Sequence, residues 1–88
     1  MSTETIREIP RRQVVLYKGD CLRYLNISIR QLLRQHGPLE EGASIDWILC
    51  YARPPKVERP TSQQIREYKI DLEQRIISDL YNKGIKVI

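Results

Sequence analysis

Apolar and polar positions alternate with different periods along the chain, and turn residues separate the segments. Residues 13–18 are rich in β-branched and aromatic side chains and stop at Gly19-Asp20, which predicts a strand. Residues 45–52 are almost continuously apolar, a pattern typical of a central strand that is buried on both faces of a sheet. Residues 84–88, at the C-terminal end, predict a short final strand.

The segment from residue 20 to residue 36 allows three interpretations. In the first it is one long helix, with Asp20 as the N-cap and the leucine and isoleucine side chains on one face. In the second the helix breaks at residues 26–28, and Ser28 starts a second helix through a capping box with Gln31. In the third its first part is the second strand of a hairpin. All three place a helix over its second half.

Residues 61–82 carry the most regular helical pattern. Thr61 is a favourable N-cap, Gln64 completes a capping box, and Gly84 can end the helix in a left-handed conformation. The apolar stripe on one face consists of Ile65, Tyr68, Leu72, Ile76 and Leu80. The three prolines of residues 53–60 predict an extended connector before this helix.

The order of these elements predicts an α/β protein. We expect a single small domain with β-α-β-α-β order, an extra early strand in one interpretation, and a three- to four-stranded sheet with two helices. The chain has 88 residues, 41% of them hydrophobic and 30% charged, which allows one modest core and disfavours a deep cleft. Residues 1–12 predict a flexible basic N-terminal arm or a weakly held edge segment, and residues 13–88 the domain.

Residue types that carry catalysis or bind metals are few and scattered. The only histidine, His36, falls at the end of a predicted helix, where a structural role is the simplest explanation. Cys21 and Cys50 have no CxxC partner, which favours reduced thiols and a cytoplasmic location. The chain holds no apolar run of about 20 residues and no signal-peptide pattern. We therefore expect no enzyme activity, no cofactor, no metal site and no membrane partner.

The basic residues are concentrated in the first part of the chain. Residues 1–36 carry the whole formal net charge of +4, and the remainder is neutral on balance. In the long-helix interpretation, three arginines form an exposed ridge off the apolar face, and such a ridge beside a basic arm is suited to nucleic-acid phosphates. The candidate nucleic-acid-binding residues are Arg7, Arg11 and Arg12 in the arm, and Arg23, Arg30 and Arg34 on the ridge.

Part of this region resembles a known DNA-binding motif. Residues 24–34, which read Tyr-Leu-Asn-Ile-Ser-Ile-Arg-Gln-Leu-Leu-Arg, are similar to the turn and second helix of bacterial helix–turn–helix regulators. The resemblance implies that this second helix faces a major groove, with Arg30 and Arg34 near bases or phosphates. The segment departs from the motif at Leu22, where a small residue is usual, and at Gln35, where an apolar residue is usual. The β-rich flanking segments do not predict the third helix of such domains.

The long C-terminal helix has a second apolar stripe. Ile70, Ile77 and Tyr81 lie roughly 120–160° around the helix axis from Ile65. One sheet cannot cover both stripes, so we expect another element of the domain or a protein partner to cover the second. Open sheet edges favour the same kind of contact.

These features lead to one preferred function and two alternatives. The preferred hypothesis is a small non-enzymatic protein–protein interaction or regulatory module. It would be a homodimer or an accessory subunit of a larger assembly, with Ile70, Ile77 and Tyr81 at the interface. The first alternative is a nucleic-acid-binding protein that uses the basic arm and the arginine-lined helix. The second alternative is a small thiol-dependent enzyme.

Overall fold

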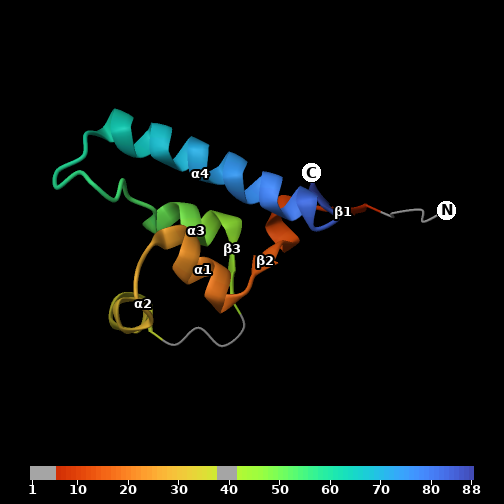
Figure 1. Ribbon diagram of the computed structural model, residues 1–88, viewed down its shortest axis with the longest axis horizontal. Coiled ribbons are helices and arrows are strands. Elements are labelled where there is room, and N and C mark those ends of the chain that lie inside the picture. The colour runs from red at the N-terminus through yellow and green to blue at the C-terminus, as the bar shows by residue number, and fades with distance from the viewer. Residues whose placement is uncertain (1–5, 38–41) are drawn as a thin grey trace.

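The computed structural model describes residues 6–37 and 42–88, apart from the side chains of residues 35 and 36 (Figure 1). These residues form a small α/β domain of four α-helices and short strands in two small sheets. The helices are α1 (Lys18–Leu25), α2 (Ile29–His36), α3 (Ile45–Tyr51) and α4 (Ser62–Asn82). The strands are β1 (Arg7–Ile9), β2 (Val15–Leu16), β3 (Ala43–Ser44) and β4 (Ile85–Val87), and a 3₁₀ helix (Arg11–Gln13) lies between β1 and β2.

Among the described residues, two separate two-stranded sheets replace the three- to four-stranded sheet that the sequence predicts. β1 pairs in parallel with β4, with Arg7 opposite Ile85. β2 pairs antiparallel with β3, with Leu16 opposite Ala43. β4 lies where the final strand is predicted, whereas β2 keeps only two residues of the predicted first strand. Strands this short cannot organise a core, so the helices supply most of it.

Residues 45–51 form the helix α3, so the predicted central strand is wrong. Ser44 is the N-cap of this helix, and its hydroxyl accepts a hydrogen bond of 3.2 Å from the backbone N–H of Trp47. The buried residues of this segment recur at the i, i+3, i+4 and i+7 positions of a helical face and are Ile45, Ile48, Leu49 and Ala52. A short apolar run fits both a strand and a helix, and the serine cap favours the helix.

The early helical segment contains two helices, α1 and α2, as the second interpretation predicts, and neither the single helix nor the hairpin forms. Asn26 ends α1 in the left-handed conformation, with φ 55° and ψ 42°. Ser28 then caps α2, because its hydroxyl accepts a hydrogen bond of 3.1 Å from the Gln31 backbone N–H. Tyr17 rather than Asp20 occupies the N-cap of α1.

The long helix α4 begins where the sequence predicts. Thr61 and Gln64 form the expected capping box, with hydrogen bonds of 2.9 and 3.2 Å. Ile65 and Tyr68 of the predicted stripe are half-buried. The fully covered part of that stripe consists of Leu72, Ile76 and Leu80.

The core lies between α4 and the shorter helices. Figure 1 shows α4 along the top of the molecule, with α3 and then α1 beneath it. α4 packs on α3 and β4, and α3 packs on α1. In the described part of the chain, no helix combines the length and apolarity that a membrane span requires.

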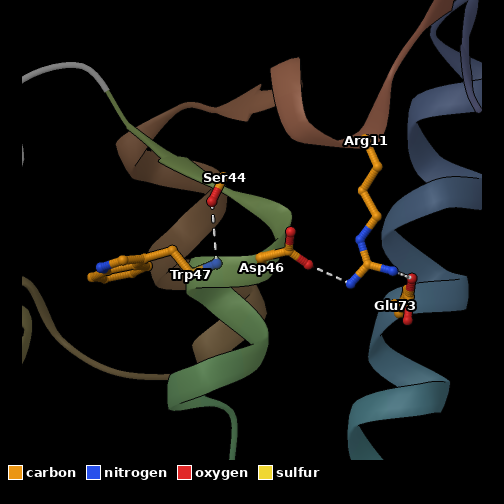
Figure 2. A network of polar contacts seen from close by, with 5 residues as sticks. All are labelled: Arg11, Ser44, Asp46, Trp47 and Glu73. Atoms are coloured by element: carbon orange, nitrogen blue, oxygen red, sulfur yellow. Dashed lines mark hydrogen bonds and ion pairs between the residues drawn. The ribbon is translucent and has the colours of Figure 1, made fainter.

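The segment Arg7–Gln13 is held against two helices. The Arg11 guanidinium forms ion pairs with Asp46 on α3 and with Glu73 on α4 (Figure 2). Its side chain is 38% exposed, so water screens the pairs only in part. The described part of the predicted N-terminal arm is therefore an edge strand and a turn, and residues 1–5 lie outside the described residues.

We expect the Arg11→Gln variant to lose about 1–2 kcal/mol of its free energy of unfolding, because two carboxylates lose a charged partner that joins two helices. Urea denaturation followed by circular dichroism measures the change. Arg12→Gln, an exposed neighbour in the same turn, is the matched control and should change stability by less than about 0.5 kcal/mol. Equal losses in the two variants would contradict a bridging role for Arg11.

Candidate nucleic-acid interface

α1 and α2 form a helix–turn–helix unit. Each helix has 8 residues, and only residues 26–28 separate them. In Figure 1, α2 is seen along its own axis whereas α1 lies across the view, so the two helices cross steeply. Two short helices joined by a three-residue turn are the element order of the helix–turn–helix motif.

The turn between the two helices has a defined conformation. Asn26 suits it because asparagine tolerates the left-handed backbone better than most residues. The backbone N–H of Ile27 donates a hydrogen bond of 3.3 Å to the Leu22 carbonyl, and the Ile27 side chain packs against the core. Leu32 on α2 is completely buried. These contacts fix which face of α2 points outward.

Neighbouring elements support the unit in a way that the sequence does not predict. α3 packs against α1 and supplies a third helix. β2 leads into α1 and β3 follows α2, so the β2–β3 pairing ties together the two ends of the unit. Leu22, where the motif usually has a small residue, is half-buried.

The outward face of α2 is cationic and apolar. Arg30 and Arg34 each lie about 160° around the helix axis from the buried Leu32, and both are exposed. Beside them, Ile29 is 50% exposed and Leu33 is 43% exposed. The sequence pattern places these two aliphatic residues on the buried face of a long helix. Ser28 is the sequence signal for this difference, because its cap begins a new helix after the turn. In this new helix Leu32 is the buried residue.

Ion pairing separates Arg30 and Arg34 from the other candidate arginines. Neither forms an ion pair with any described residue. Arg23 lies on α1, 3.3 Å from the Asp20 carboxylate, so the predicted three-arginine ridge does not form. Within the described part of the chain, no carboxylate neutralises the positive charge of Arg30 and Arg34.

The arginines of the N-terminal segment lie elsewhere. Arg11 is engaged in its two ion pairs, whereas Arg7 and Arg12 are exposed. Figure 1 places β1 at the C-terminal end of α4, well away from α2. The structure does not bring these three arginines together with those of α2.

A cluster around Tyr24 joins the helix–turn–helix unit to α4. The Tyr24 hydroxyl donates a hydrogen bond of 2.6 Å to the Asp79 carboxylate. The guanidinium groups of Arg23 and Arg75 lie 4.9 and 5.5 Å from the centre of the Tyr24 ring. Burial, and then the bond to Asp79, raises the pKa of the Tyr24 hydroxyl above its usual value. The folded protein therefore favours the neutral form of the Tyr24 side chain.

The two thiols lie in different surroundings. Cys21 is completely buried and donates to the Leu16 carbonyl across 3.7 Å, and burial raises its pKa. Cys50 is exposed and borders a groove between the turn of residues 26–28 and the end of α3. The His36 side chain lies outside the described residues, among which no three His, Cys, Asp or Glu side chains gather as metal ligands.

The second stripe of α4 reaches the surface. Ile70 is 50% exposed and Tyr81 is 52% exposed, whereas Ile77 is half-buried. These residues lie on the face of α4 opposite the core. The described part of the domain therefore leaves two of the three predicted interface residues largely uncovered.

Comparisons of the chain with protein-family models, with curated proteins and with solved structures find no match.

The raised pKa of Tyr24 predicts a loss of stability at alkaline pH. The unfolded chain releases the tyrosine proton near pH 10, whereas the folded protein retains it to higher pH. This contribution to stability is complete below about pH 10 and is lost as the pH rises through the pKa of the folded protein. Tyr24→Phe removes the ionisable group, so its free energy of unfolding should fall less between about pH 9 and 11 than that of the unaltered protein.

Urea denaturation at several alkaline pH values measures this difference. Tyr17→Phe is the matched control, because Tyr17 is 78% exposed. The control should retain the pH dependence of the unaltered protein. Parallel curves for Tyr24→Phe and the unaltered protein would show that the Tyr24 proton is not linked to folding.

Proposed function

We propose that this protein binds duplex DNA through its helix–turn–helix unit, with α2 in the major groove. The observation that carries the proposal is the pair of exposed arginines, Arg30 and Arg34, opposite the one buried leucine of the second helix. The likeness to known motifs is an analogy at the level of local structure, so the site itself has to support the function.

The dimensions of α2 suit a major groove. A helix with its side chains is about 10–12 Å across, and the major groove of B-form DNA is about 12 Å wide. Arg30 and Arg34 are one turn apart and point in nearly the same direction, so both can reach the same stretch of duplex. Arginine suits phosphates and guanine edges because it donates two parallel hydrogen bonds.

The local structure of α2 adds to the proposal. Leu32 is completely buried, the Ser28 capping box fixes the start of the helix, and Tyr24 joins the preceding helix to α4. A helix whose start is fixed by a cap presents Arg30 and Arg34 one turn apart on one side.

The test compares two double variants with the same loss of charge. Arg30→Gln/Arg34→Gln should weaken binding to a duplex of about two helical turns by at least tenfold. Lys56→Gln/Arg59→Gln is the matched control, because both side chains are exposed and lie outside the helix–turn–helix unit and outside α4. Fluorescence anisotropy at about 50 and 200 mM salt measures the affinity and its salt dependence.

The control should bind within about threefold of the unaltered protein, since net charge alone has only a diffuse effect. The slope of log affinity against log salt should be smaller by up to about 2 for the α2 variant. Equal losses in the two variants, or no binding by the unaltered protein at low salt, would reject the proposal.

A second surface favours self-association as a second function. Ile70, Gln74, Ile77 and Tyr81 recur at intervals of four, three and four residues, as the core positions of a coiled coil do. Two of them, Ile70 and Tyr81, are about half-exposed, at 50% and 52%. Arg66 and Asp71 flank this stripe on opposite sides and are both exposed. In a parallel pair of α4 helices, Arg66 of one copy would face Asp71 of the other.

Ile70→Glu should shift this association toward the monomer, because it places two like charges together at the seam. Sedimentation equilibrium over a range of protein concentrations measures the change. Gln63→Glu introduces the same charge at an exposed position in the first turn of α4 and serves as the control. A monomer at all concentrations of the unaltered protein would exclude the second function and leave DNA binding by one copy untouched.

A further inference from the structure

We infer that α2 distinguishes base pairs by two parallel rows of side chains. Ile29 and Leu33 contact thymine methyl groups, and Arg30 and Arg34 donate hydrogen bonds to guanine. This inference rests on the proposed DNA binding and goes beyond it, because phosphate contacts alone carry no sequence preference. The ligand that it names is a duplex segment with guanine and thymine in the major groove.

Burial in the core does not account for the apolar row formed by Ile29 and Leu33. Ile29 is 50% exposed and Leu33 is 43% exposed, although they lie one turn apart on a helix with only one buried leucine, Leu32. Exposed aliphatic side chains that adjoin each other mark a binding surface more often than single ones. The thymine C5-methyl group is the apolar feature that base edges present in the major groove.

The cationic row runs alongside the apolar one. Arg30 and Arg34 follow Ile29 and Leu33 directly in sequence, so the two rows are about 100° apart around the axis. Within each row the rise is about 6 Å, close to two base-pair steps of about 3.4 Å. Ile29 and Arg30 are the first two residues of α2, the part of a recognition helix that contacts base edges.

Among the described side chains of α2, none matches cytosine or adenine. Cytosine presents an amino donor, and α2 contains no carboxylate to accept from it. Adenine is usually read by an amide that uses its oxygen and nitrogen together. The Gln31 oxygen already accepts from the Ser28 backbone N–H at 3.5 Å, as part of the capping box. The described side chains of α2 therefore favour guanine and thymine.

The test begins with selection of bound duplexes from a randomised pool. The selected duplex is then prepared with deoxyuridine in place of thymine, which removes only the methyl groups, or with 7-deazaguanine, which removes the N7 acceptor. Loss of one contacted methyl should weaken binding by the unaltered protein roughly three- to fivefold. Loss of the guanine acceptor should weaken it about tenfold.

Variants assign each effect to its row. Ile29→Ala/Leu33→Ala should bind the thymine and uracil duplexes equally, and Arg30→Ala/Arg34→Ala should bind the guanine and 7-deazaguanine duplexes equally. Val15→Ala is the control, because Val15 is also an exposed aliphatic residue, at 59%, and lies on β2 outside α2. It should keep the full discrimination of the unaltered protein.

The outcomes separate the inference from the function on which it rests. Duplex binding with no response to either base analogue would overturn the inference and leave the proposed function standing. No duplex binding at low salt would overturn both.

Binding to vesicles of equal parts phosphatidylserine and phosphatidylcholine is measured in parallel. Binding to them without duplex binding, lost in Ile29→Ala/Leu33→Ala, would assign this face to lipid headgroups and also overturn the inference.

Discussion

The buried face of α4 is the support on which this small domain is assembled. A chain of 88 residues can build only one modest core, and here the core forms where Leu72, Ile76 and Leu80 meet the shorter helices. Two polar contacts reinforce that packing at different points. Arg11 joins α3 to α4, and Tyr24 joins α1 to α4 through Asp79. These contacts hold α1 and α3, and the turn of residues 26–28 leads from α1 into α2.

The arginines of the described residues fall into two groups, those with ion pairs inside the domain and those without. Arg11 forms ion pairs that join α3 to α4, whereas Arg23 contacts Asp20 and Tyr24 of its own helix α1. Arg30 and Arg34 meet no described carboxylate and are exposed on α2. A formal net charge of +4 says little about function by itself, and this division identifies which arginines meet no described carboxylate.

Local capping signals predicted more of the structure than apolar patterns did. Thr61 with Gln64 places the start of α4 correctly, and Ser28 with Gln31 places the start of α2 in one of the three interpretations, whereas the N-cap predicted at Asp20 is wrong. The apolar run at residues 45–52 predicted a strand, because an i, i+4 stripe and an unbroken run look alike over so short a length. The two ion pairs of Arg11 could not be predicted from the sequence. Their carboxylates, on Asp46 and Glu73, lie 35 and 62 residues further along the chain, and no local pattern relates them to residue 11. The outward direction of Ile29 and Leu33 followed only once the turn at Asn26 was known.

The central claim is that α2 is the surface by which this protein recognises its ligand. Titration of the isotope-labelled protein with a short duplex, followed by amide chemical shifts, tests it most directly. The account predicts that the largest shift changes fall on residues 28–34, with the core of α4 unaffected. Changes confined to the exposed face of α4 around Ile70 and Tyr81, or no changes at a saturating duplex concentration, would contradict it.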